Sequence, residues 1–160
     1  VCNVDEEAIA DGNEMSRRME THADLRSAPC VAISAEIEME LAQLLPSEAL
    51  EFLGELGHGR TAREILVDAG YELLELITFF TTGPKETHSR AIRAGTVARD
   101  AAGKIHSDFA RGFVRAEVVA SDLFVRHGGF TGAREAGMLR TEGKDYVVQD
   151  GDVVNVLFNV

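Results

Sequence analysis

Basic side chains are concentrated in one stretch of this 160-residue chain, between residues 85 and 115. Seven lysines and arginines lie there against three acidic residues. Side chains of this kind neutralise the phosphates of nucleic acids, so the stretch could hold RNA. An ordinary solvated face is the alternative, and composition alone favours it. If the stretch does bind RNA or a ribosome, the residues that we expect to make contact are Arg90, Arg93, Arg99, Lys104 and Arg115.

The net charge of −11 is divided unevenly along the chain. Residues 1–75 hold 17 acidic and 5 basic side chains, whereas residues 76–160 hold 10 acidic and 11 basic side chains. The resulting net charges, −12 and +1, indicate two units with different partners.

The sequence offers little for metal or acid–base chemistry. No two of the five histidines are four residues apart, and no Cys/His cluster has zinc spacing. The segment 150–152 lacks the later glutamate of a calcium loop, so we interpret it as a hairpin turn. His106 and Asp108 could form a catalytic pair, but a helix-terminal turn is the more ordinary explanation. We predict no catalytic residue and no metal site in this chain.

The two cysteines, Cys2 and Cys30, cannot make a disulfide framework and lie in apolar surroundings. We interpret them as buried strand thiols in a reducing compartment. No apolar run approaches the ~20 residues of a membrane span. The acidic N-terminal residues lack the basic start of a signal peptide. These features predict a cytoplasmic protein without a membrane partner.

Strand and helix patterns alternate in residues 1–45. Residues 29–33 have the pattern of a short buried strand, and residues 14–23 and 34–44 have helical character. This alternation is typical of an α/β domain with a parallel sheet. Residues 1–4 resemble the end of a strand without its beginning, so we expect the chain to start inside a domain.

Residues 46–75 have the pattern of two helices that form a connector. We predict that Ser47 caps the first helix and that Gly57 ends it. Thr61 and Glu64 have the spacing of a capping box, which predicts the start of the second helix.

Residues 76–160 have a different pattern, in which strands rich in β-branched and aromatic residues surround a short helix. The predicted elements are a hairpin at 77–82 and 87–92, a helix at 97–103 ended by Gly103, a strand at 113–120, a helical turn at 133–138, and strands at 146–148 and 153–160. This order predicts an α+β unit, and it fits the compact β-grasp (ubiquitin-like) arrangement.

Several long strings in this second part resemble one known family. They are LITFFT at 76–81 with GPKE at 83–86, AAGKIHSDF at 101–109, RGFVRAEV at 111–118, EGKDYVVQDGDV at 142–153 and FNV at 158–160. Together they resemble the TGS domain of the Obg-like ATPase (YchF) family along its whole length, and FNV resembles that family's natural C-terminus. The resemblance implies a β-grasp TGS domain at 76–160, preceded by the C-terminal fragment of a P-loop nucleotide-binding domain at 1–45 and the connector at 46–75.

The N-terminal residues resemble the same family more loosely. Asn3-Val4-Asp5-Glu6 stands where P-loop GTPases carry Asn-Lys-x-Asp, whose Asp accepts hydrogen bonds from guanine. Similar Asn-x-x-Glu motifs mark the Obg-like ATPases, which implies that ATP is preferred over GTP. On this resemblance Asn3 positions the base, Val4 packs on the purine and Glu6 discriminates between bases. Without the resemblance, the motif is a common string that fits a solvated acidic turn.

A second base-binding segment lies at residues 33–36. It resembles the Ser-Ala loop that closes over the base in P-loop GTPases, in which small residues let backbone N–H groups approach the ring. The resemblance therefore assigns Ser34 and Ala35 to the base. Ser34 also stands where a helix N-cap is expected, and both roles are compatible.

The phosphate-binding part of such an enzyme is missing from this sequence. No Gly-x-x-x-x-Gly-Lys-Ser/Thr string occurs, and residues 103–105 lack the leading glycine and the hydroxyl. This chain alone should therefore not hydrolyse nucleotide or bind a cofactor tightly. The resemblance implies that a longer parent binds ATP, and GTP more weakly, with Mg²⁺, and hydrolyses ATP.

The resemblance further implies a ribosome or rRNA partner and a role linked to translation or to redox and other stress. A stand-alone TGS-type module that binds RNA or protein is the alternative. One departure weakens a partner contact: residues 87–92 read THSRAI where the family usually has Arg-Ala-Trp-Thr-Ile, and the chain contains no Trp.

Overall fold

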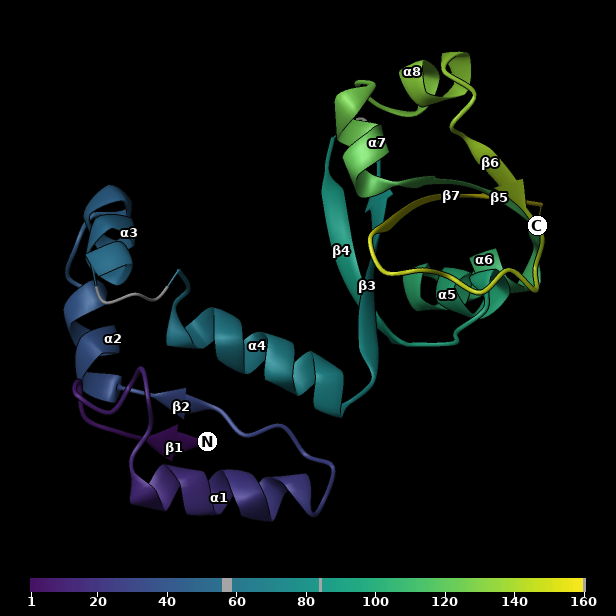
Figure 1. Ribbon diagram of the computed structural model, residues 1–160. Coiled ribbons are helices and arrows are strands. Elements are labelled where there is room, and N and C mark those ends of the chain that lie inside the picture. Colours follow the sequence, from purple (N-terminus) through teal and green to yellow (C-terminus); the bar gives the residue numbers. More distant parts are fainter. Residues whose placement is uncertain (56–58, 84, 160) are drawn as a thin grey trace. The chain divides into compact units, whose positions relative to one another are not determined.

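The structure is a computed structural model that describes residues 1–55, 59–83 and 85–159. The chain divides into two compact units, Val1–Leu74 and Glu75–Val160 (Figure 1). Helices and strands mix in both units, as the sequence predicts. The predicted helix end at Gly57 lies outside the described residues. None of the described helices is long and apolar enough to cross a membrane.

The first unit begins with a short βαβ arrangement. Strand β1 (Cys2–Asn3) pairs in parallel with β2 (Ala32–Ile33), and helix α1 (Glu14–Asp24) connects them. Asn13 begins α1, because its side chain accepts a hydrogen bond from the Ser16 N–H while the Ser16 hydroxyl accepts one from the Asn13 N–H. This connection brings the ends of β1 and β2 to the same edge of the small sheet.

Three further helices complete the first unit. They are α2 (Ala35–Leu41), α3 (Pro46–Glu55) and α4 (Ala62–Leu73). Buried Ile37, Leu41 and Leu53 form a core cluster between α2 and α3. The Glu38 carboxylate accepts a 2.7 Å hydrogen bond from the Ala62 N–H at the start of α4. Of the predicted connector, α3 thus contributes Leu53 to this core, and α4 is joined to α2 by the Glu38–Ala62 hydrogen bond.

The helix starts in this unit follow local capping chemistry. Thr61 and Glu64 form the predicted capping box, and Ser34 caps α2 as predicted. The prediction that Ser47 caps α3 is wrong, because the helix begins one residue earlier, at Pro46. Proline fits the first helical position, where its missing N–H is not needed. The preceding Leu45 carbonyl accepts the first intrahelical hydrogen bond from Ala49.

The second unit is built around a five-stranded mixed sheet in the order β4-β3-β7-β5-β6 (Figure 1). Its elements are β3 (Leu76–Thr82), β4 (Thr87–Arg93), α5 (Ala98–Ile105), α6 (Ser107–Arg111), β5 (Phe113–Ala120), α7 (Ser121–Arg126), α8 (Phe130–Glu135), β6 (Arg140–Glu142) and β7 (Asp152–Phe158). Only the β3–β7 pair is parallel; the other pairs are antiparallel.

Both faces of this sheet are covered. Successive residues of a strand point to opposite faces, and Val118 and Val119 of β5 accordingly belong to different core clusters. Val118 packs with Phe79 and with Ala101 of α5 on one face. Val119 packs with Ala133 of α8 on the other face. The central strands of the sheet are therefore buried on both sides, whereas most residues of the edge strand β4 are exposed.

The C-terminal strands differ from the sequence prediction. Residues 146–148 form only an isolated bridge, between Val147 and Val97, and β7 lies between β3 and β5. The segment 149–152 is thus a turn that leads into β7 and does not connect two neighbouring strands. The backbone of 146–148 pairs instead with the start of α5, where the Val148 N–H donates to the Thr96 carbonyl and the Ala98 N–H donates to the Tyr146 carbonyl. The buried Asp152 carboxylate, which accepts hydrogen bonds from Tyr146, Arg140 and the Gln149 N–H, holds the turn that follows. The edge strand β6 was not predicted.

The helix predicted to end at Gly103 continues to Ile105. A Cβ atom built on Gly103 would lie 3.3 Å from the Ala110 Cβ. Gly103 therefore allows α5 and α6 to approach closely, which is a packing role and not a helix stop. The predicted helical turn at 133–138 is instead α8, which ends at Glu135.

Candidate functional site

The two predicted base-binding segments meet in the first unit. The Asn3 side-chain oxygen accepts a 3.0 Å hydrogen bond from the Ala35 N–H, across 32 residues of sequence. One residue further on, the Val4 N–H donates to the Ile33 carbonyl at 2.9 Å. These contacts lie at the carboxyl ends of two parallel strands, the edge at which α/β sheets bind ligands. We call residues 3–6 with 34–35 the base loop.

The five predicted members of the base loop differ in the solvent exposure and the hydrogen bonds of their side chains. Ser34 and Val4 are buried, with 1% and 7% of their surface exposed. The Ser34 hydroxyl is occupied as a helix cap by the Ile37 N–H. Glu6 is exposed, and its carboxylate makes no hydrogen bond to another described residue, although its backbone carbonyl accepts one from the Ile9 N–H. Among the residues predicted to contact the base, Glu6 therefore has the side chain that is most available to a ligand.

Sequence reasoning assigned no role to Asp5, which the structure places at the turn of the base loop. Its carboxylate accepts a 3.0 Å hydrogen bond from the Ala8 N–H. An aspartate that caps the N–H three residues later is a recognisable turn signal, and this signal could have been found in the sequence. Asp5 fixes the loop that carries Glu6.

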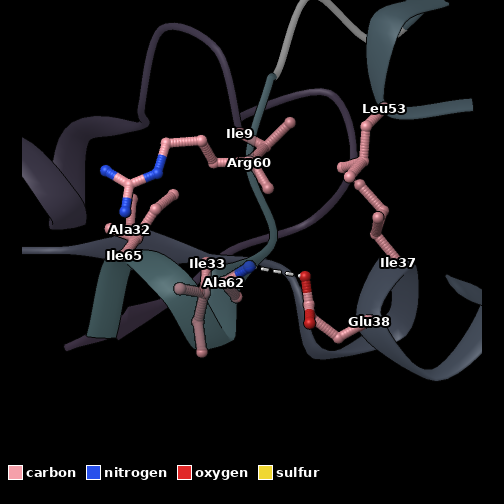
Figure 2. Close-up of a pocket in the computed structure, with 9 residues that line it drawn as sticks. All are labelled: Ile9, Ala32, Ile33, Ile37, Glu38, Leu53, Arg60, Ala62 and Ile65. Atoms are coloured by element: carbon pink, nitrogen blue, oxygen red, sulfur yellow. Dashed lines mark hydrogen bonds between the residues drawn. The ribbon is translucent and has the colours of Figure 1, made fainter. Parts of the chain in front are cut away.

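A small, partly open cavity lies beside β2, but it is too small for a nucleotide. Figure 2 shows Ile33, Ile37, Leu53 and Ile65 around it, with Glu38 accepting the hydrogen bond from Ala62. Its volume is about 30 Å³, which is room for one or two water molecules. None of the predicted base-binding residues lines it. The cavity is a packing defect in the first unit's core rather than a ligand site.

Four of the five cations predicted at RNA lie on two neighbouring elements of the second unit. Arg90 and Arg93 belong to β4, and Arg99 and Lys104 belong to α5. The Arg90 guanidinium donates a 3.3 Å hydrogen bond to the Lys104 carbonyl, which joins the two elements. Arg93 and Lys104 line one open hollow of about 500 Å³. We call these four residues the basic patch.

The fifth cation, Arg115, is separate from the basic patch. It lies on β5 two residues before Glu117, and therefore on the same face of the sheet as Glu117. That face carries Arg134 and Asn155, both of which donate hydrogen bonds to the Glu117 carboxylate. Burial opposes the ionisation of Glu117, but these two hydrogen bonds outweigh it and hold the pKa of Glu117 below its ordinary value.

Ion pairing separates the arginines of the second unit into two sets. In the part of this unit that the structure describes, Arg111, Arg126, Arg134 and Arg140 each contact a carboxylate. The remaining arginines have no carboxylate within ion-pair distance in the described residues. That unpaired set is Arg90, Arg93, Arg99 and Arg115. The arginines predicted to contact RNA are thus those whose charge is not already compensated.

His106 and Asp108 both make contacts that stabilise the start of α6. The His106 Nδ1 accepts a 3.2 Å hydrogen bond from the Asp108 N–H at the start of α6. The Asp108 carboxylate pairs with Arg111 at 2.6 Å. Both groups therefore stabilise the helix-terminal turn, as the sequence interpretation has it. Among the described residues no group of three His, Cys, Asp or Glu side chains could hold a metal ion.

Comparisons with known proteins identify the family of this chain. The family model YchF-GTPase_C, described as a protein of unknown function (DUF933), matches residues 76–159. The Ribosome-binding ATPase YchF of Bacillus subtilis (strain 168) is 45% identical over 162 residues, which cover 100% of this chain and 44% of the relative. The protein of the same name from Pasteurella multocida (strain Pm70) is 44% identical over 160 residues, with the same coverage.

A solved structure extends the likeness to three dimensions. The Schizosaccharomyces pombe YchF GTPase matches with a TM-score of 0.81 and 30% identity, over 98% of this chain and 42% of that one. The fold and the strings of residues 76–159 thus define a protein of the YchF GTPase type. The chain belongs to the YchF family. It spans less than half the length of the relatives that it matches.

Proposed function

We propose that this chain is the C-terminal portion of a cytoplasmic, ribosome-associated P-loop ATPase. The relatives named Ribosome-binding ATPase YchF support the class of activity. The observation that carries the proposal is the split among the second unit's arginines, because the unpaired set includes every arginine of the basic patch. In this proposal the second unit is a β-grasp TGS domain that contacts ribosomal RNA.

Unpaired arginines suit phosphate recognition for a simple energetic reason. A paired guanidinium must lose its carboxylate before it binds a phosphate, whereas an unpaired one exchanges only water and counterions. Arg93 and Arg99 are both exposed, so their guanidinium groups are open to solvent. Arg90 is half-buried and bonded to the Lys104 carbonyl, so its role is to hold β4 against α5.

Ribosome co-sedimentation of a double variant tests the RNA contact. In Arg93→Glu/Arg99→Glu, two exposed cations of the basic patch are reversed without touching the core. We expect the apparent affinity for ribosomes in low salt, measured from the pelleted fraction, to fall at least about tenfold. Phosphate contacts are lost and charges of the same sign as the phosphates are introduced. The unmodified chain should lose binding steeply as salt rises.

The matched control is Arg111→Glu/Arg126→Glu. It changes the net charge by the same amount, at arginines whose side chains are 71% and 68% exposed but ion-paired. We expect this control to pellet nearly as well as the unmodified chain. Equal losses in the two double variants would show that total charge and not the basic patch decides binding. Undiminished pelleting of the patch variant would exclude the patch.

The base loop supports the nucleotide part of the proposal. The Asn3–Ala35 hydrogen bond fixes the distance between the two segments, and the exposed Glu6 carboxylate is available to discriminate adenine from guanine. Residues that precede this chain in the longer protein would hold the phosphates and Mg²⁺. We infer that ATP is preferred over GTP and that this chain by itself does not hydrolyse nucleotide.

A one-carbon shortening of Glu6 tests the base preference in that longer protein. Because Asp can accept two hydrogen bonds from the guanine edge, Glu6→Asp should shift the ratio of ATP to GTP affinity toward GTP. We expect a shift of about tenfold, the size of one hydrogen bond to a charged group. Glu7→Asp makes the same change at an exposed neighbour and should leave the ratio unchanged. A ratio that does not respond to Glu6→Asp, with binding intact, would contradict the assignment.

A further inference from the structure

The two cysteines of the chain lie next to each other in the first unit. The Cys2 and Cys30 sulfurs are 3.9 Å apart, although 28 residues separate them in sequence. Backbone pairing brings them together, because the Cys2 N–H donates a 2.7 Å hydrogen bond to the Val31 carbonyl. Both side chains are half-buried, so a small solute can reach them. The sequence interpretation of both as buried strand thiols is wrong, because both are only half-buried and Cys30 lies outside β2.

We propose that Cys2 and Cys30 are a modification site at which a peroxide forms a reversible intramolecular disulfide. In the first step the Cys2 thiolate attacks hydrogen peroxide, the O–O bond breaks, and a sulfenic acid and water result after proton uptake. In the second step the Cys30 sulfur attacks the sulfenic sulfur and expels the hydroxyl, which leaves as a second water. Two thiols are thereby oxidised by two electrons, and one peroxide is reduced to two waters.

The bond requires the two sulfurs to approach each other. They must close from 3.9 Å to about 2.05 Å, and we expect rotation about the two Cα–Cβ bonds to supply this movement. Burial and the hydrogen bond to Cys2 raise the pKa of the Cys30 thiol. A protonated thiol is the poorer first nucleophile, so the first attack is assigned to Cys2 and the resolving step to Cys30.

The disulfide would lock the strand pair that supports the base loop. Cys2 directly precedes Asn3, and Cys30 lies two residues before β2. The Asn3–Ala35 hydrogen bond already joins the carboxyl ends of the two strands. A bond between the sulfurs would join their amino ends as well, so β1 and β2 could no longer separate. This inference rests on the sulfur geometry and not on nucleotide binding.

Intact-mass spectrometry of the reduced chain treated with hydrogen peroxide tests the proposal. After alkylation with iodoacetamide, the expected product is a monomer that has lost two hydrogens and carries no alkyl group. Treatment with dithiothreitol should restore two alkylatable thiols. Native chain should form the bond at least about tenfold faster than chain unfolded in urea, because the fold holds the sulfurs together.

Single variants separate the two steps. Cys30→Ser should stop at a Cys2 sulfenic acid that dimedone traps, and Cys2→Ser should react more slowly with peroxide than Cys30→Ser does. The proposal is overturned if the native chain keeps two alkylatable thiols, or if it forms the bond no faster than the urea-unfolded chain. Accumulation of only intermolecular dimers or sulfinic acids in the unmodified chain would overturn it equally.

Discussion

The two units of the chain are built on sheets of very different extent. The first unit has one pair of two-residue strands and a core cluster of three buried side chains. The second has a five-stranded sheet with buried clusters on both faces. Short parallel strands gain little stability by themselves, whereas a sheet covered on both faces buries a large apolar area. We therefore expect the second unit to be the more stable one.

The units also differ in how their charges are used. Residues 1–75 carry a net charge of −12, and residues 76–160 carry +1. Such an acidic first part should repel nucleic acid, so we place the proposed RNA contact in the second unit. Within that unit, four arginines are compensated by carboxylates and four are not. We therefore propose that net charge selects the unit, and that local pairing within it selects the surface for a phosphate-rich partner.

The largest effect should come from the core of the second unit. Phe79 is completely buried in the cluster between the sheet and α5, so Phe79→Ala should destabilise this unit by ~3–5 kcal/mol. Leu53→Ala removes a buried side chain of the first unit and should cost ~2–4 kcal/mol there. Amide hydrogen exchange resolves the two units. If Phe79→Ala loosened residues 1–74 as much as the second unit, the two units would not be independent.

An intermediate effect is expected from the hydrogen-bonded Glu117. Because its pKa is lowered in the folded state, the ionised carboxylate stabilises the second unit. This contribution is complete above the ordinary glutamate pKa of 4.5 and is lost as the pH falls through the lowered value. We expect a modest loss, because burial offsets part of what the hydrogen bonds from Arg134 and Asn155 contribute.

Urea unfolding between pH 7 and pH 3 measures this contribution. In Glu117→Gln the acid-dependent loss should be smaller than in the unmodified chain, because the amide does not titrate. Glu135→Gln is a control at an exposed glutamate for which no ion pair occurs among the described residues. Identical pH profiles for the unmodified chain and Glu117→Gln would contradict the assignment.

The smallest effect concerns Glu75, the first residue of the second unit. Its φ of 53° lies in the left-handed region, which costs a residue with a Cβ about 1–2 kcal/mol. The Ala94 N–H, which donates to the Glu75 carbonyl at 2.7 Å, holds it there. Glu75→Gly should therefore raise stability by about 1 kcal/mol. Glu72→Gly, inside α4, should lower it by about 0.5–1 kcal/mol. Thermal unfolding compares the two, and equal signs would disprove the strain at Glu75.

The sequence predicts those features that depend on neighbouring residues. The Thr61–Glu64 capping box and the Ser34 cap involve residues three apart, and the structure contains both. The strand predicted at 146–148 failed because this segment pairs with a distant part of the chain: the Val148 N–H donates to the Thr96 carbonyl, and the Tyr146 carbonyl accepts from the Ala98 N–H. Local patterns carry no information about such contacts.

In the candidate sites too, contacts between distant residues could not be predicted from the sequence. The base loop was predicted from resemblance, and its closure by Asn3 and Ala35 spans 32 residues. Pairing partners of the arginines also come from distant positions, as when Arg134 contacts Glu117 from 17 residues away. Charge counts along the sequence therefore could not separate compensated from free arginines. The adjacency of the two cysteines was equally invisible, because it depends on the pairing of β1 with β2.

Arginine footprinting on the ribosome tests the central claim most directly. The chain is treated with phenylglyoxal, free and bound to ribosomes, and modification is read from its peptides by mass spectrometry. Ribosome binding should protect Arg93 and Arg99 and leave Arg126, exposed but ion-paired, as reactive as in the free chain. Protection of Arg126 with Arg93 and Arg99 unchanged, or protection confined to arginines of residues 1–74, would contradict the account.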